Sequence, residues 1–320
     1  MISSPERRNV QVVGLSETGR SAMVDDAGEL SFGDTRPERP IVVGYNGKNH
    51  SRDALLWAAA EAARRDAPLL VVYAANYPGM TLGPGPGLLE PEPGALDAAQ
   101  EVTVRGVSEA LAAAPGLHVA GATEVTSPSE ALTEESARAA LLVIGSRGYG
   151  RVVGALLGSV AFAVAARARC PVIVVKDEPT KRPVGPDHRV VVGTDGSPQA
   201  AAAVGFAADR ATVASAALEV VTCTGEHPGM DADQLRATAA LIAGSTAEQV
   251  RDTHPGLTVT TRVEDCPPER TLVDASSDAG MVVVGTRGRG AFEGMLLGSV
   301  SHAVIHGAQC LVAVVEEDHV

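Results

Sequence analysis

The chain carries one glycine-rich pattern twice, and this pattern is typical of a backbone that holds phosphate. The first copy reads Gly145-Ser146-Arg147-Gly148, then nine residues, then Gly158-Ser159-Val160. The second reads Gly285-Thr286-Arg287-Gly288, then nine residues, then Gly298-Ser299-Val300. Glycine lets backbone N–H groups approach an anion, and a following helix N-terminus adds favourable partial charge. Because the internal spacing recurs, we expect a duplicated nucleotide site in which these six glycines leave room for phosphates.

Two serines and two polar turn residues complete the candidate sites. Ser159 and Ser299 stand directly before predicted helices, where a serine can cap the helix, contact phosphate, or do both. Asp195 follows the first strand of the second copy and could contact the nucleoside or hold its own turn. Asn46 occupies the same place in the first copy, where the two interpretations are equally open.

The duplication extends over most of the chain. Residues 41–47 match residues 190–196 at an offset of 149, and residues 115–119 match residues 255–259 at an offset of 140. The first copy therefore holds nine additional residues, which we place in the Pro- and Gly-rich segment 78–94. We expect an N-terminal extension at 1–39, a first domain at 40–176, a linker at 177–188 and a second domain at 189–318. Residues 11–14 and 21–24 could form a hairpin, or the extension could be a partly ordered tail.

Each copy alternates apolar strand-like runs with helical segments, which indicates a parallel sheet covered on both faces. In the first copy, strands are predicted at 41–45, 69–74, 117–125, 141–145 and 171–175, and helices at 51–65, 95–114, 128–138 and 158–169. Ser51 is the expected N-cap of the first helix. In the second copy, strands are predicted at 190–194, 218–223, 257–264, 281–285 and 311–315, and helices at 197–213, 231–253, 268–278 and 298–309.

Composition narrows the function classes. The net charge of −13 argues against nucleic acid as a partner, because nucleic-acid binders present a basic face. The four cysteines lack C-x-x-C spacing, and His302 and His306 have no acidic third ligand nearby, so neither a disulfide framework nor a metal site is expected. No apolar run reaches the roughly 18 residues of a membrane span. The absence of a signal-like N-terminus favours a cytoplasmic protein.

These features together resemble the universal stress protein family, in its ATP-binding, tandem-domain form. The resemblance covers about residues 40–317 and rests on Gly193-Thr194-Asp195-Gly196-Ser197, on the motif G-x2-G-x9-G-S in both copies, and on the closing run 170–175. It implies two flavodoxin-like, Rossmann-like domains, each a five-stranded parallel sheet with helices on both faces. ATP, with or without Mg²⁺, would lie at the carboxyl ends of the strands, as is general for open α/β sheets.

The resemblance also implies residue roles and an assembly. The glycines and the following Ser159 or Ser299, with Val160 and Val300 behind them, would hold phosphate, and Asp195 would contact the nucleoside. Asn46 departs from that pattern and lacks the charge-assisted hydrogen bond, a loss of about 1 kcal/mol. The two copies would form an intrachain pseudo-dimer through their last strands, and the chain could also form a homodimer.

The leading functional hypothesis is a non-catalytic adenine-nucleotide sensor in stress response. The rival hypothesis is an enzyme, such as a slow ATPase or an adenylating enzyme. Efficient phosphoryl transfer needs a metal anchor and a residue that positions the nucleophile, and no G-x4-G-K-S/T loop with its lysine appears. A third hypothesis, an interaction scaffold with empty sites, does not explain the intact glycines.

Overall fold

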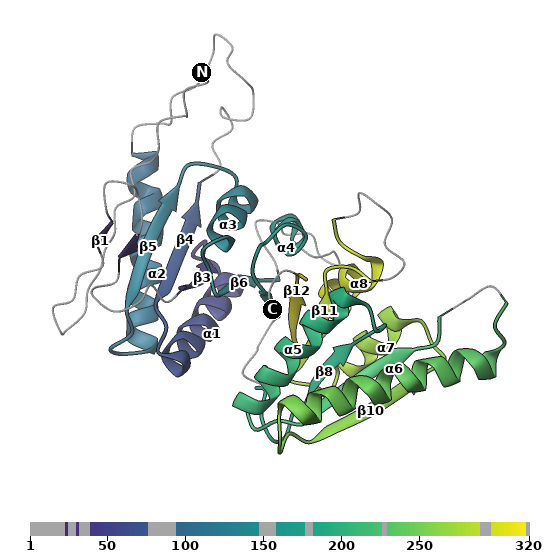
Figure 1. Ribbon diagram of the computed structural model, residues 1–320. Coiled ribbons are helices and arrows are strands. Elements are labelled where there is room, and N and C mark those ends of the chain that lie inside the picture. The colour runs from purple at the N-terminus through teal and green to yellow at the C-terminus, as the bar shows by residue number, and fades with distance from the viewer. Residues whose placement is uncertain are drawn as a thin grey trace, which may run out of the picture. The chain divides into compact units, whose positions relative to one another are not determined.

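A computed structural model describes residues 23–24, 30–31, 39–75, 94–146, 158–176, 182–225, 229–288 and 296–317. The chain separates into two compact units, Met1–Gly145 and Ser146–Val320. In each unit helices lie on both sides of the strands (Figure 1). Among the described helices, none has the length and apolar character needed to cross a membrane.

The first unit contains a parallel sheet in the order β6-β3-β4-β5. Its elements are β1 (Met23–Val24), β2 (Leu30–Ser31), β3 (Ile41–Gly44), α1 (Asn49–Arg65), β4 (Leu69–Ala74), α2 (Ala95–Ala113), β5 (Val119–Glu124), α3 (Pro128–Ser136) and β6 (Leu141–Gly145). β1 and β2 pair antiparallel as a separate small hairpin. β1 overlaps the expected segment 21–24 but pairs with β2, and segment 11–14 lies outside the described residues, so the predicted pairing of 11–14 with 21–24 stays a prediction.

The second unit contains the sheet β10-β9-β8-β11-β12-β7. Its elements are α4 (Ser159–Ala165), β7 (Val172–Val175), β8 (Val190–Gly193), α5 (Pro198–Val213), β9 (Leu218–Cys223), α6 (Ala232–Thr253), β10 (Val259–Glu264), α7 (Pro268–Ala275), β11 (Met281–Gly285), α8 (Ser299–Gly307) and β12 (Leu311–Val315). The first five strands in that order are parallel, as the sequence pattern predicts. The fold is therefore a tandem α/β, Rossmann-like architecture.

The last strands of the two copies pair with each other. β12 runs antiparallel to β7, with Ala313 opposite Ile173 and Val312 opposite Val174. Ile173 and Ala313 are equivalent residues of the repeat, so the pair is symmetric about this point. This confirms the predicted pairing of the two closing strands.

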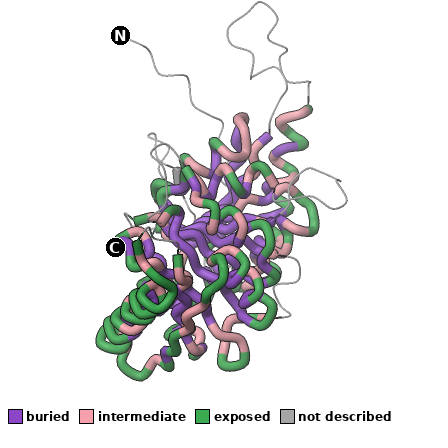
Figure 2. The backbone as a smooth tube through the Cα atoms, turned by 90° about the vertical axis from the view of Figure 1, so that its right-hand side faces the viewer, coloured by how far each residue is buried: buried purple, intermediate pink, exposed green. Residues whose placement is uncertain are grey.

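Small apolar side chains fill both cores. Most of the largest fully buried residues are Ile, Leu and Val on the strands, and the helices add single large residues such as Leu55, Leu272 and Ile305 to many buried alanines. Figure 2 shows the buried stretches running through the sheets while the outer helix surfaces are exposed. Alanine brings helices close to the sheets, which explains how 3% aromatic residues suffice. Each buried Val or Leu contributes about 1.5–3 kcal/mol relative to exposure.

Side-chain caps mark the starts of three of the eight helices that the structure describes. Ser127, Ser197 and Asp231 accept backbone N–H groups of the first turns of α3, α5 and α6, as N-cap residues do. The prediction that Ser51 caps α1 is wrong. The helix begins at Asn49 after Lys48, which makes no side-chain cap, and Ser51 lies buried inside the first turn.

Candidate functional site

The carboxyl end of β8 holds Asp195 in a fixed turn. The Asp195 carboxylate oxygen Oδ1 accepts the Ser197 N–H at 2.9 Å, and the Thr194 hydroxyl accepts the Gly196 N–H at 3.1 Å. Gly196 has φ of 72°, a left-handed conformation that glycine adopts without strain. Ser197 then caps α5 by accepting the Ala200 N–H at 3.2 Å. The turn therefore fixes the orientation of Asp195 at the carboxyl ends of the strands.

The glycine-rich loop after β11 lies against this aspartate. A Cβ atom added to Gly288 would stand 2.6 Å from Asp195 Oδ2, so the backbone of the loop lies close to the carboxylate and a side chain at this position would displace it. Both ends of the loop are anchored: Gly298 donates its N–H to Thr286 O at 2.8 Å, and the Ser301 hydroxyl donates to Gly285 O at 2.6 Å. Sequence reasoning missed Ser301, whose partner in the first copy is Ala161.

Gly145 and Gly285 have a packing role that the sequence did not reveal. A Cβ on Gly145 would lie 2.5 Å from His50 O, and a Cβ on Gly285 would lie 3.1 Å from Gln199 O. His50 and Gln199 are equivalent residues in the first turns of α1 and α5. In both copies the strand end thus touches the backbone of the first helix. The close approach of two backbones, rather than room for phosphate alone, requires these glycines.

The first copy arranges its turn differently. Asn46 Oδ1 accepts the Ser51 hydroxyl at 2.7 Å and the Lys48 N–H at 3.1 Å. The Asn46 N–H donates in turn to Ser51 Oγ at 3.1 Å. Ala200 stands where the first copy has Ser51, so the second copy lacks this internal partner. The amide oxygen of Asn46 is therefore engaged by its own turn, whereas Asp195 directs its second oxygen at the glycine loop.

A large side chain accompanies Asn46. Tyr45 replaces Thr194, points toward α2 and donates its hydroxyl to Glu109 Oε1 at 3.1 Å. Burial, helped by this hydrogen bond, raises the pKa of Tyr45. A Cβ on Gly106 would lie 2.7 Å from the Tyr45 ring, so glycine at this position makes room for the ring. The second copy has Thr246 in that place.

Two helix N-termini complete the candidate sites. Gly158 and Gly298 are the N-cap residues of α4 and α8, and Ser159 and Ser299 are exposed at the first helical positions. Val160 and Val300 follow and are half-buried. A glycine N-cap has no side chain that could accept a hydrogen bond from the helix. The N–H groups of a helix's first turn also have no partner within the helix. The α8 end therefore presents donors beside the loop that approaches Asp195.

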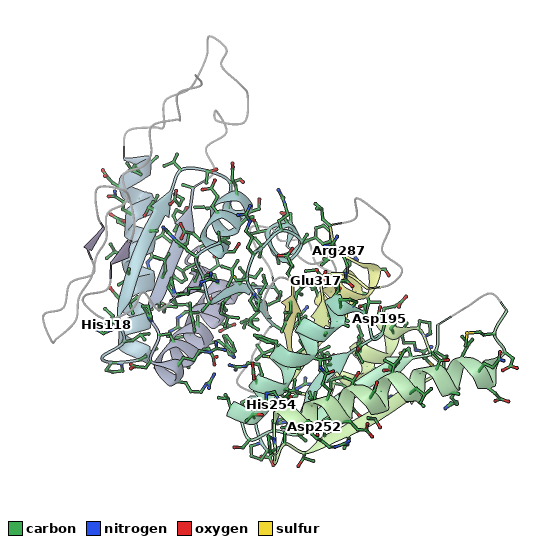
Figure 3. The ribbon with its side chains drawn as sticks, viewed as in Figure 1. His118, Asp195, Asp252, His254, Arg287 and Glu317 are labelled. Atoms are coloured by element: carbon green, nitrogen blue, oxygen red, sulfur yellow. The ribbon has the colours of Figure 1, made fainter. Side chains whose placement is uncertain are left out.

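Some predicted positions cannot be placed. Gly148 and Arg147 lie outside the described residues, so the structure assigns no geometry to that part of the first loop. Arg287 is exposed in the second loop. Figure 3 shows Asp195, Arg287 and Glu317 in one region of the second unit. Glu317 accepts a hydrogen bond from Gln199 Nε2 at 2.9 Å, which adds an acidic group near the start of α5.

A second polar cluster lies elsewhere in the unit, at the end of α6. His254 bridges Asp209 Oδ1 and Thr253 Oγ1, each at 2.9 Å, which resembles the order of groups in a hydrolase triad. The Thr253 hydroxyl, however, also contacts Gln249 O at 3.0 Å and Val250 O at 3.2 Å of its own helix. The cluster therefore closes a helix end. Within the described ranges, no three His, Cys, Asp or Glu side chains gather in a way that could hold a metal ion.

Comparison with known proteins shows which sequences and structures this chain is similar to. The sequence model described as the universal stress protein family matches residues 38–176 and 188–316. Universal stress protein Rv2005c of Mycobacterium tuberculosis is 34% identical over 293 residues, which cover 88% of this chain and 98% of the relative. Rv2623 of the same organism is 31% identical, covering 87% and 96%. A universal stress protein structure from Archaeoglobus fulgidus superposes with a TM-score of 0.62 at 20% identity, covering 88% of this chain and all of that one.

Proposed function

We propose that this chain, which belongs to the universal stress protein family, binds an adenine nucleotide, preferentially ATP, and acts as a regulator without rapid turnover. The observation that carries the proposal is the approach of Gly288 to Asp195. The loop backbone thus lies next to a carboxylate that its own turn orients, and backbone N–H donors of α8 follow in the same segment. Asp195 would accept hydrogen bonds from the nucleoside, and the loop together with the α8 N-terminus would receive the phosphates.

Bound ATP would bring its charge and its shape to this site, and residues of this chain would recognise both. The Asp195 carboxylate is held by the Ser197 N–H, so it is ready to accept a ribose hydroxyl or an adenine amino group without reorganising. Gly298 and Ser299 place the first-turn N–H groups of α8 at the other end of the same loop. Repulsion between Asp195 and the triphosphate stays small, because solvent screens charges separated by the length of a nucleoside.

The non-catalytic role rests on what the described site contains. Rapid phosphoryl transfer requires a metal anchor and a group that positions the nucleophile. Asp195, Arg287 and Glu317 are charged side chains in this region (Figure 3), and neither glycine loop contains a lysine. A slow ATPase is the alternative, and turnover measurements separate the two.

The first experiment is calorimetric titration of the purified chain, freed of bound small molecules, with ATP, AMP and GTP. We expect ATP to bind and to raise the melting temperature, because a ligand of the native state stabilises it by mass action. GTP should bind more weakly. Absence of binding and of any melting shift at millimolar ATP would refute the proposal. Hydrolysis at about 1 s⁻¹ or faster, within the usual enzyme range, would favour the enzyme instead.

The two sites should differ in affinity, with the second copy tighter by about tenfold, or roughly 1.4 kcal/mol. The reason is that a carboxylate accepts stronger hydrogen bonds than an amide, and Asn46 Oδ1 already accepts two hydrogen bonds in its own turn. Gly148→Val and Gly288→Val isolate one site each. Asp195→Asn is the matched substitution, since it gives the second copy the amide of the first. Equal affinities in the two isolated sites would contradict the role assigned to Asp195.

A further inference from the structure

Equivalent strands at the outer edges of the two sheets differ in burial. Every residue of β5 is buried, whereas β10 is exposed or half-exposed from Thr260 onward. The repeat offset aligns Ala120 with Thr260, Ala122 with Arg262 and Glu124 with Glu264. Ala120 and Ala122 are 0% and 3% exposed. The first copy therefore hides a surface that the second copy leaves open.

The hidden surface is the side of the sheet opposite α2. A Cβ on Gly121 would lie 2.6 Å from Thr103 of α2, so odd-numbered β5 residues face that helix and Ala120 and Ala122 face away from it. Val71 of β4 lies 2.9 Å from the Cβ position of Gly106 in α2, which places Leu70 and Val72 on the opposite side. The short helix α3 packs on β3, β4 and β6, while α2 packs on β5. Leu70, Val72, Ala120 and Ala122 form what we call the β4–β5 apolar face.

In the second copy the equivalent surface is open to solvent, and polar and charged residues occupy it. There the equivalent residues include Glu219, Thr260 and Arg262. Arg189 binds Glu219 at 3.0 Å, and Arg262 binds Glu264 at 2.8 Å. Polar and charged residues thus cover the open surface, and in the first copy Leu70, Ala120 and Ala122 stand in place of Glu219, Thr260 and Arg262. An apolar patch on an edge strand invites pairing with another chain unless it is covered.

We propose that the N-terminal extension, residues 1–39, covers the β4–β5 apolar face through its β1–β2 hairpin and so keeps this face from associating with other chains. The extension precedes the first copy alone, and the match to the family begins at residue 38, after nearly all of it. It belongs to the same compact unit as β4 and β5. Its hairpin strands supply apolar residues, Met23, Val24 and Leu30, in keeping with the chemistry of the face.

The test uses the full chain with Ala120→Thr and Ala122→Arg, which copy the residues of β10. A buried arginine without a partner costs several kcal/mol, so a docked extension should be expelled. We expect trypsin to cleave within the extension at least about tenfold faster than in the parent protein, corresponding to about 1.4 kcal/mol of lost docking. The matched control is Thr260→Ala with Arg262→Ala in the open second copy, which should leave cleavage unchanged. An unchanged cleavage rate in the β5 variant overturns the proposal.

A second measurement keeps the proposal testable if the β5 variant does not fold. Hydrogen exchange is compared between the parent chain and a variant lacking residues 1–37. Amides of 119–124 should exchange at least about tenfold faster after truncation, while those of 259–264 serve as the internal control and should not change. Persistent protection of β5 would assign the cover to segment 76–93 and overturn the proposal. Loss of protection on dilution of the parent chain would assign it to a second copy, with the same consequence.

Discussion

The contact between Gly288 and Asp195 allows a sharp test of how the second site is built. Alanine at Gly288 would place Cβ 2.6 Å from Asp195 Oδ2. Gly288 is outside the left-handed region, so alanine adds no backbone strain and its effect comes from this one contact. The carboxylate must rotate away and give up its 2.9 Å hydrogen bond from the Ser197 N–H. A hydrogen bond to a charged group is worth about 1.5–3 kcal/mol.

We therefore expect Gly288→Ala to weaken ATP binding at the tighter site by at least about tenfold, or 1.4 kcal/mol, in calorimetric titrations. The matched control is Gly205→Ala in α5, outside the glycine loop, because a Cβ there would meet no atom within 4 Å. The decisive comparison is a double-mutant cycle with Asp195→Ala. If the alanine acts through Asp195, its effect disappears once the carboxylate is gone. An undiminished loss in the Asp195→Ala background would refute this reasoning and indicate a direct collision with the ligand.

Three further outcomes follow from contacts outside that pair. Gly145→Ala should destabilise the protein by about 1–3 kcal/mol in denaturant unfolding, because its Cβ would collide with a backbone carbonyl that cannot easily move; a neutral effect would contradict the packing role of this glycine. Burial raises the pKa of the Cys310 thiol to about 12, so at pH 8 a thiol reagent should modify exposed Cys266 and reach Cys310 only after unfolding; rapid labelling of Cys310 in the native protein would count against that burial. The hydrogen bond from Arg189 lowers the pKa of Asp278, so its stabilisation is present above the ordinary pKa of 3.8 and is lost as pH falls through the lower folded value. Because Asp278 is 66% exposed, Asp278→Asn should cost at most about 1 kcal/mol at pH 7 and progressively less in acid, and an effect that grew on acidification would reverse this sign.

Much of this protein is determined by the sequence alone, because its signals are local. Continuous Val, Leu and Ile runs such as residues 141–144 are typical of buried strands, and their alternation with helical segments indicates a parallel sheet. Ser197 followed by Pro198 predicts a capped helix start, and the structure has it. The duplication then predicts that both copies fold alike. The pairing of the two closing strands is expected from the resemblance to the family, and the structure has it.

Only the tertiary structure determined which atoms meet across the chain. Ser51 reads as a helix cap, yet it lies inside the first turn and holds Asn46, because the backbone of Asn46 folds back onto it. Gly145 reads as a phosphate glycine, but its lack of a Cβ is required by His50 O, a carbonyl nearly a hundred residues away. The contrast between buried β5 and exposed β10 is equally invisible in either strand by itself. Propensity and pattern act within a few residues, whereas these contacts depend on how distant segments pack.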